Sequence, residues 1–153
     1  GKILLIQRSD LKIWSLPGGM IKPNESHYDA IIREVLEETN AQIVPQELFG
    51  IYIRTIPFLE DTTFAYKSSI KKSKLKPSKE TDEVVWVPLE EALELVPQFI
   101  ATVVRDSLSI NQGTPIVRTV NYYPISIVLK FLFYNTSRLL KNTHDHLKWG
   151  VAI

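Results

Sequence analysis

The sequence contains no cysteine among its 153 residues. This absence excludes a disulfide scaffold and a thiolate metal site, and it fits the reducing environment of the cytoplasm. No signal peptide is visible. The most apolar run, residues 125–134, contains Lys130 and is far shorter than the ~20 residues of a membrane-spanning helix. We therefore expect a cytoplasmic protein that makes no use of a membrane.

The composition shows no strong bias of charge or hydrophobicity. The net charge of +1 favours no particular class of partner. The length and the hydrophobic fraction of 44% indicate one domain with a sizeable core. The chain opens directly on strand-like residues at Lys2, so we expect that native N-terminal residues, a whole strand among them, precede this numbering.

Hydrophobic patterning predicts strands and helices that alternate along the chain, which indicates an α/β layered domain. Strands are predicted at 2–8, 47–57, 62–70 and 84–88, and helices at 89–95 and 98–109, the last with Ile100, Val103, Val104 and Leu108 inward. The strands 47–57 and 62–70 are expected to pair as a hairpin. Residues 124–141 fit either a strand or a helix, and we favour a helix.

A further helix is predicted between Ser26 and Asn40. Ser26 is a plausible N-cap, with Asp29 three residues later as a variant of the capping box. Asn40 follows the last turn, and asparagine is second to glycine as the left-handed residue that ends a helix. The expected apolar face contains Tyr28, Ile31, Ile32, Val35, Leu36 and Thr39.

The same helix crowds three glutamates, Glu34, Glu37 and Glu38, into five residues. Like charges at these spacings repel one another by a few tenths of a kcal/mol per pair. One interpretation is a solvated face on which Arg33 pairs with Glu37. The other is a site for a hard cation, because Mg²⁺ prefers oxygen ligands and commonly takes one or two carboxylates together with substrate phosphates.

The residues around the glutamates favour the cation site. Gly18 and Gly19 lie just upstream, where backbone can approach a ligand closely. From Gly19 the order is glycine, five residues, Glu25, seven residues, then Arg33-Glu34-Val35-Leu36-Glu37-Glu38, one residue, Asn40 and Ala41. This resembles the Nudix box, G-x5-E-x7-R-E-U-x-E-E-x-G-U with U aliphatic, in six of its seven fixed charged or glycine positions. The departure is Asn40, where the family has glycine.

The flanking segments also resemble the Nudix family: KILLIQR and WSLPGG before the box, and TDEVVWVPLEEA after it. The resemblance implies an α/β/α sandwich with a mixed β-sheet over residues 1–110. We expect residues 111–153 to form a C-terminal extension that packs on this domain or on a partner. Asparagine tolerates the left-handed conformation best among non-glycine residues, so we expect the fold to survive Asn40.

The resemblance also implies hydrolysis of a nucleoside diphosphate linked to another group, with Mg²⁺ or Mn²⁺ as cofactor. Glu34 and Glu38 would be the main metal ligands, with contributions from Glu37 and the carbonyl of Gly18. Arg33 would hold a glutamate in position, and Glu25 would brace Arg33. One glutamate would act as general base, either in the box or on a later loop. The later candidates are Glu80, Asp82 and Glu83, of which we select Glu83.

Other features favour structural interpretations. The segment with Lys67, Lys71, Lys72, Lys74, Lys76 and Lys79 is expected to be a solvated hairpin or a lysine-protected edge strand rather than a nucleic-acid surface. His144 and His146 are expected to be surface residues, and His27 to be exposed. Trp14, Tyr52 and Phe64 are expected to pack in the scaffold. The apolar residues 125–133 are expected to cover the domain's own core or to meet a second copy in a homodimer.

Three functions therefore remain open at this stage. The first is a metal-dependent hydrolase of nucleoside diphosphate derivatives. The second is a nucleotide-binding or regulatory module that keeps the fold without the chemistry. The third is an isomerase on the same fold, because a fold does not dictate a reaction.

Overall fold

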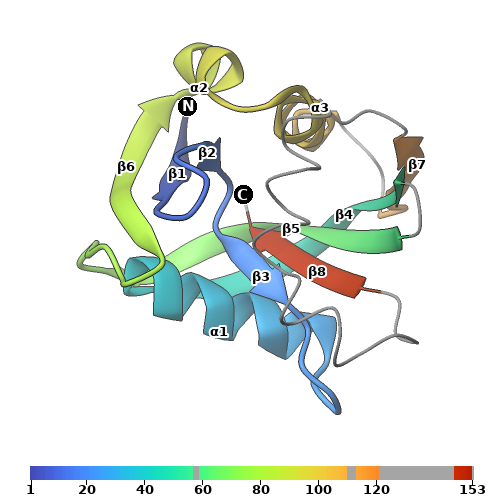
Figure 1. Cartoon of the computed structure of the whole chain (residues 1–153), viewed down its shortest axis with the longest axis horizontal. Coiled ribbons are helices and arrows are strands. Elements are labelled where there is room, and N and C mark those ends of the chain that lie inside the picture. The colour runs from blue at the N-terminus through green and yellow to red at the C-terminus, as the bar shows by residue number, and fades with distance from the viewer. Residues whose placement is uncertain (57–58, 110–112, 121–146, 153) are drawn as a thin grey trace.

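The computed structural model describes residues 1–56, 59–109, 113–120 and 147–152. It contains three helices and eight strands in these residues (Figure 1). The strands are β1 (Lys2–Arg8), β2 (Trp14–Ser15), β3 (Gly18–Met20), β4 (Ala41–Ile56), β5 (Leu59–Ser73), β6 (Thr81–Pro88), β7 (Ile116–Val120) and β8 (Leu147–Ala152). The helices are α1 (His27–Thr39), α2 (Leu89–Leu95) and α3 (Gln98–Ser107).

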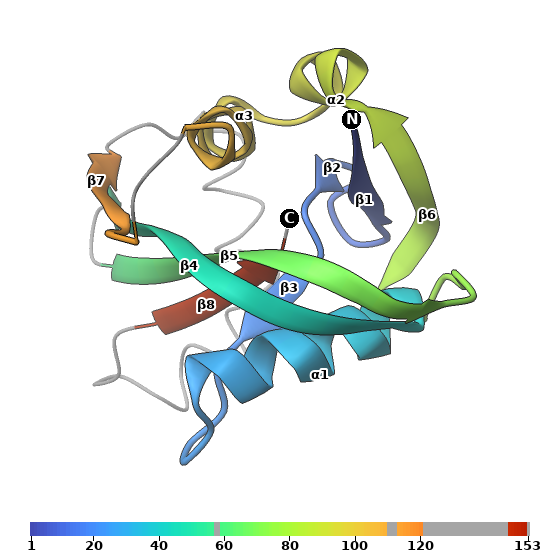
Figure 2. The same cartoon turned by 180° about the vertical axis from the view of Figure 1, so that it is seen from behind.

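The strands form two sheets. A three-stranded antiparallel sheet has the order β2-β1-β6, and a five-stranded mixed sheet has the order β3-β8-β5-β4-β7. Helix α1 lies along one face of the mixed sheet, while α3 lies on the opposite side of β4, as the two opposite views show (Figures 1 and 2). The arrangement is the predicted α/β/α sandwich with a mixed sheet.

Strands β4 and β5 form the predicted antiparallel pair and are longer than the sequence indicated. Their register runs from Ala41 opposite Ser73 to Ile56 opposite Leu59. The pairing passes through bulges at Pro45 and Leu48, where the hydrophobic alternation is interrupted. Strand β8 pairs with β5 only at residues 61–66, so among the described strands the lysine-bearing residues 67–73 pair with β4 alone. Lys71, Lys72 and Lys74 are exposed, in agreement with the prediction of a solvated hairpin or a lysine-protected edge strand for this segment.

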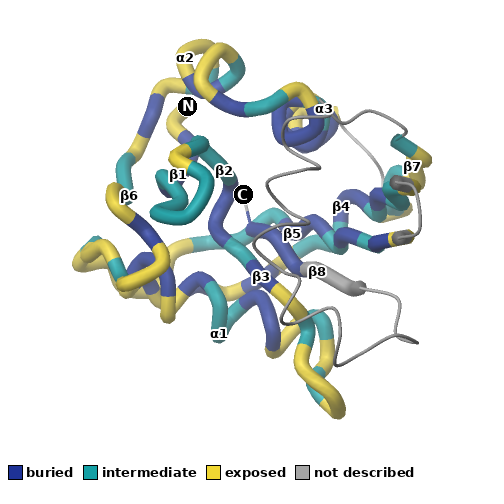
Figure 3. Tube along the Cα trace, in the orientation of Figure 1, coloured by how far each residue is buried: buried dark blue, intermediate teal, exposed yellow. Residues whose placement is uncertain are grey.

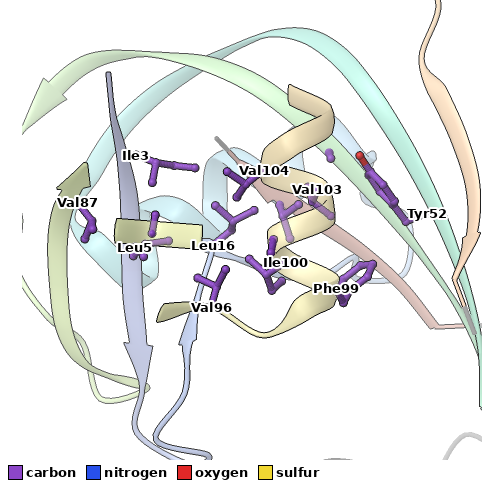
Figure 4. Packing of buried hydrophobic residues seen from close by; sticks show 14 of the residues in the cluster. Ile3, Leu5, Leu16, Tyr52, Val87, Val96, Phe99, Ile100, Val103 and Val104 are labelled. Carbon is purple, nitrogen blue, oxygen red and sulfur yellow. The ribbon is translucent and has the colours of Figure 1, made fainter. Parts of the chain in front are cut away.

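Two hydrophobic clusters form the core. The larger one lies between β1, the face of the mixed sheet that contains Tyr52, and helix α3, which contributes Phe99, Val103 and Val104 (Figure 4). The smaller one lies under α1 and includes Ile31 and Val35. The buried residues follow these contact faces of the helices and strands, whereas α2 is largely exposed (Figure 3).

Some predicted core positions are on the surface. Tyr28 and Leu36 in α1 are both 41% exposed, and Leu108 after α3 is 58% exposed. The predicted apolar arc of α1 was wider than the face that the mixed sheet covers. Pro97 separates α2 from α3 as expected, because proline cannot continue a helix that precedes it.

The described parts of the predicted C-terminal extension belong to the mixed sheet. Strand β7 pairs in parallel with β4 at residues 50–54, and β8 lies between β3 and β5. The sequence analysis did not predict β8. The predicted helix 124–141, the apolar residues 125–133 and both C-terminal histidines lie outside the described residues. No helix in the described part of the chain is long and apolar enough to cross a membrane.

Candidate active site

Helix α1 begins and ends as the sequence predicted. The Ser26 hydroxyl accepts a hydrogen bond from the Asp29 amide at 3.0 Å and donates one to the Asp29 carboxylate at 2.6 Å. Asn40 has φ 58° and ψ 18°, the left-handed conformation, and its amide donates to the Leu36 carbonyl at 2.9 Å. These caps determine which turn of α1 carries each glutamate.

Arg33 connects the helix to the loop before it. Its guanidinium donates to both carboxylate oxygens of Glu25, at 2.7 and 2.9 Å, and to the carbonyl of Met20 at 3.0 Å. A third nitrogen, Nη1, lies 2.5 Å from Glu34 Oε1. These hydrogen bonds hold the pKa of Glu25 at about 2, well below its usual range. The prediction that Arg33 reaches Glu25 and orients a neighbouring glutamate is confirmed.

The two glycines before the helix allow close approach of their neighbours, the Glu34 carboxylate at Gly19 and strand β8 at Gly18. A Cβ built on Gly19 would lie 2.5 Å from the carboxyl carbon of Glu34. Gly18 has φ 151°, and a Cβ there would lie 2.0 Å from the carbonyl oxygen of Gly150 in β8. The Gly18 amide donates to Glu38 Oε2 at 2.8 Å. Side chains at either position would therefore displace a carboxylate or the neighbouring strand.

Glu38 is a buried carboxylate in a mainly acidic environment. Its residue is only 7% exposed, and burial raises its pKa to about 8. The hydrogen bond from Gly18 lowers this pKa, while the charges of Glu34 and Glu80 raise it further. Burial also raises the pKa of Glu34, although Arg33 acts in the opposite direction. Burial therefore favours the protonated form of both carboxyl groups, most strongly for Glu38, and their ionisation has a cost in free energy that a bound cation would offset.

Arg8, at the end of β1, interacts electrostatically with Glu38 and Glu80 and was not considered in the sequence analysis. It is held by two hydrogen bonds to Asp10, at 3.0 and 2.6 Å. Burial lowers its pKa, but the hydrogen bonds and charge of Asp10, together with the charges of Glu38 and Glu80, raise it overall. An arginine that interacts electrostatically with both glutamates is a cation close to the carboxylates. The only sequence signal was a charged residue at the end of a buried strand.

The remaining predicted acidic residues are more exposed than Glu38, although Glu37 raises the pKa of Glu34 and Glu80 raises that of Glu38. The Glu37 side chain is 55% exposed, with its Oε2 3.4 Å from Arg33. Glu83 is exposed and pairs with Gln7 across β6 and β1. The Asp82 carboxylate forms an exposed ion pair with Lys12 at 2.6 Å. Of the three later candidates, Glu80 is the one that interacts with Glu38.

This geometry can be compared with known proteins. A family model described as the NUDIX domain matches residues 1–106 of the chain. The chain belongs to the Nudix family. The match covers β1 to β6, α1, α2 and nearly all of α3, while β7 and β8 of the mixed sheet lie beyond it.

Individual relatives and solved structures agree with this family. The chain is 36% identical over 98 residues to a putative 8-oxo-dGTP diphosphatase of Bacillus subtilis (strain 168), covering 63% of this chain and 64% of that protein. It is 32% identical over 108 residues to a MutT-like protein of Streptomyces ambofaciens, covering 71% and 69%. The crystal structure of a MutT protein from Bacillus halodurans superimposes with a TM-score of 0.68 at 26% identity, covering 81% and 84%.

The residues of this Nudix site fit a divalent cation whose coordination would be completed by substrate oxygens. No three histidine, aspartate or glutamate side chains in the described residues already converge as a metal-ligand cluster. Glu38 is buried and Glu34 is half-buried, and the pKa of each is raised by a neighbouring glutamate, Glu37 for Glu34 and Glu34 for Glu38, so a bound cation would relieve the repulsion. Two carboxylates with phosphate oxygens are a common ligand set for Mg²⁺.

The aromatic residues that the sequence analysis considered, and His27, pack against other side chains of the scaffold. His27 is half-buried, so the expectation that it is exposed was wrong: its ring stacks on Phe64 with centroids 4.8 Å apart and its Nδ1 lies 2.6 Å from the Tyr66 hydroxyl. Tyr52 is fully buried in the larger cluster, which Trp14 also contacts. These contacts confirm scaffold packing for the three aromatic residues that the sequence analysis considered.

Proposed function

We propose that this protein hydrolyses a phosphoanhydride bond in a nucleoside diphosphate derivative, using Mg²⁺ or Mn²⁺. The observation that carries the proposal is the buried Glu38 carboxylate, with its pKa raised to about 8 beside Glu34 and Glu80. A buried carboxylate next to other carboxylates has a cost in free energy unless a cation and an anionic substrate complete the site.

The proposed ligands are Glu34 and Glu38, with Glu37 and the Gly18 carbonyl as further contributors. Bound metal would neutralise phosphate charge and lower the pKa of a water molecule. Arg33 holds Glu34 through a single hydrogen bond from Nη1, while its fork of Nε and Nη2 binds Glu25, and the Gly18 amide orients Glu38. Because Arg33 also binds Glu25, the loop before α1 is tied to the helix.

The general base is proposed among the glutamates of the helix or of the later segment. Within the helix the candidates are Glu34 and Glu37. In the later segment the sequence favoured Glu83, while the electrostatic interaction with Glu38 favours Glu80. Arg8 is proposed to contact the phosphates, since a guanidinium binds phosphate oxygens through two parallel hydrogen bonds.

The substrate is proposed from the relatives that the chain resembles. One is named a putative 8-oxo-dGTP diphosphatase, so oxidised deoxynucleoside triphosphates are the first compounds to test. ADP-ribose, nucleotide sugars and dinucleoside polyphosphates complete the panel. Each of these contains a phosphoanhydride bond attached to a nucleoside.

The test is an incubation of the protein with this panel in Mg²⁺ and, separately, in Mn²⁺, with phosphate and nucleotide products measured. We expect hydrolysis of at least one compound, abolished by a chelator. The control is Glu38→Gln, which removes a charge at nearly constant shape. An absence of turnover on every compound in both metals would overturn the proposal and favour a nucleotide-binding module, which calorimetry would detect as binding without hydrolysis.

The structure weakens the reason for expecting an inactive module. The departure of this chain from the box is Asn40, and Asn40 adopts the left-handed conformation that the family's glycine would take. A cytoplasmic location and a homodimer remain predictions, which cell fractionation and light scattering would test.

A further inference from the structure

The C-terminal end of α1 is completed by a distant segment, residues 74–81. The last carbonyls of a helix have no partner within the helix itself. Here the Lys76 amide donates to the carbonyl of Thr39 at 3.0 Å, and the Thr81 hydroxyl donates to the carbonyl of Glu38 at 3.1 Å. The segment is therefore the C-terminal cap of the helix that carries the glutamates.

Asn40 fastens this segment by its side chain. The carboxamide Nδ2 donates to the carbonyl of Lys74 at 2.8 Å. A glycine would adopt the same left-handed backbone but has no donor to offer. The residue that departs from the Nudix box thus makes a contact that the box glycine lacks.

The fastened segment carries a carboxylate to the site. Glu80 follows directly before Thr81, and its charge contributes to the raised pKa of Glu38. On the other side, the Ser9 amide donates to the carbonyl of Glu80 at 3.0 Å. The Ser78 amide donates to the Thr81 hydroxyl at 2.8 Å, and the same hydroxyl donates to the backbone carbonyl of Glu38. The backbones of Glu38 and Glu80 are consequently joined through Thr81.

We propose that Asn40 is a positioning residue for the metal site. By binding the Lys74 carbonyl it keeps segment 74–81 against α1, and so sets the separation of Glu80 and Glu38. This inference rests on the function proposed above, in that the separation matters because Glu38 is a proposed metal ligand and Glu80 a proposed general base at the same site. A small displacement of a catalytic group is sufficient to lower a rate strongly.

The test compares Asn40→Gly with Lys74→Ala. The first keeps the left-handed backbone and removes the donor. The second is the matched control, because it removes a side chain while the accepting carbonyl remains. Three quantities are measured in the full chain: hydrogen exchange of the segment, Mn²⁺ affinity by electron paramagnetic resonance, and kcat and KM on the best substrate.

For Asn40→Gly we expect exchange of the Lys76 amide to be about fivefold faster, the factor for one lost hydrogen bond. Mn²⁺ affinity and kcat should each fall by about threefold to tenfold with KM little changed. The unfolding midpoint should stay within about 3 °C of the wild type, because glycine adopts the left-handed backbone easily and only the hydrogen bond to the Lys74 carbonyl is lost. Lys74→Ala should match the wild type in all three.

A second variant keeps the inference testable if Asn40→Gly folds poorly. Asn40→Asp keeps the shape and tolerates the left-handed region, but its carboxylate cannot donate to a carbonyl, so it should show the same losses. Wild-type exchange and Mn²⁺ affinity in both variants would overturn the inference, as would equal losses in Lys74→Ala or unfolding of both variants. If the wild type hydrolyses nothing, the proposed function fails, while exchange and Mn²⁺ affinity still decide the role of Asn40.

Discussion

Two buried carboxylates, on helices that cover opposite faces of the mixed sheet, have different surroundings. Glu38 in α1 and Asp106 in α3 are 7% and 6% exposed. Asp106 accepts hydrogen bonds from the Tyr52 hydroxyl at 3.1 Å and from two nitrogens of Arg118 at 2.6 and 2.8 Å. Glu38 accepts one amide hydrogen bond from Gly18 and lies in the field of further carboxylates.

The difference separates a structural charge from a functional one. Asp106 ties α3 to β4 and β7, and its partners satisfy both oxygens, as buried charges generally require. Glu38 is left with a raised pKa, which is typical of a group that waits for a ligand. A buried carboxylate therefore contributes to stability on one face of the mixed sheet and, in our proposal, to chemistry on the other face.

The largest expected effect is that of Glu38→Gln on catalysis. We expect kcat/KM to fall at least about 100-fold, because an amide is a much poorer ligand for a hard cation. The unfolding midpoint should change little at neutral pH, because the Glu38 carboxyl is mostly protonated there, and should exceed that of the wild type above about pH 8, where the change removes a poorly compensated buried charge. Steady-state kinetics and thermal unfolding measure the two quantities. Activity close to that of the wild type would remove Glu38 from the site.

The pH dependence of stability should reveal the same carboxylate in metal-free protein. The pKa of Glu38 rises from an ordinary 4.5 to about 8 in the folded state, so its contribution to stability is fully present below 4.5 and is lost as pH rises through 8. We expect the free energy of unfolding to fall by about 2–4 kcal/mol between about pH 5 and pH 9 from this group. Urea titrations across this range measure it.

The control for this pH effect is Glu38→Gln, which should flatten the slope. Excess Mg²⁺ should also reduce it, because a cation favours the ionised carboxylate that high pH produces. A slope that persists in the variant would assign the pH dependence to other groups.

Asp106→Asn should reverse the pattern seen for Glu38. Asp106 accepts three hydrogen bonds, two at Oδ2 and one at Oδ1, and an amide replaces one of these oxygens by an NH2 group, so it cannot satisfy all three donors and also loses the charge that pairs with Arg118. We expect a loss of about 1–3 kcal/mol from the hydrogen bonds of this buried group. In the same preparation, kcat at 25 °C should stay within about twofold of the wild type. A loss of kcat as large as that of Glu38→Gln would end the distinction between the two faces.

The smallest effect is expected for Glu37→Gln. The Glu37 side chain is 55% exposed, and its contact with Arg33 is long at 3.4 Å. Exposed charges contribute little because water screens them. We expect kcat/KM to fall by less than about tenfold and stability to be unchanged. A loss equal to that of Glu38→Gln would show that exposure does not rank these ligands.

Local features of the fold and the site were readable from the sequence because they depend on short spacings. The caps of α1, the contact of Arg33 with Glu25 and the place of Gly18 and Gly19 all follow from residues within about one box length. The aromatic environment of His27 was missed, because Phe64 and Tyr66 come from β5, far along the chain. Strand β8 was missed for the same reason, since its neighbours β3 and β5 lie 80 or more residues earlier.

The sequence by itself determined the Nudix membership and the helix with three glutamates at fixed spacings, because periodicity and capping are local properties of the chain. Only the tertiary structure decided which glutamate is buried and which is exposed. It also decided that Arg8 and Glu80 share the electrostatic field of Glu38, and that Asn40 binds the segment that ends the helix. Burial and electrostatic interaction depend on distances between strands and loops that sequence separation does not encode.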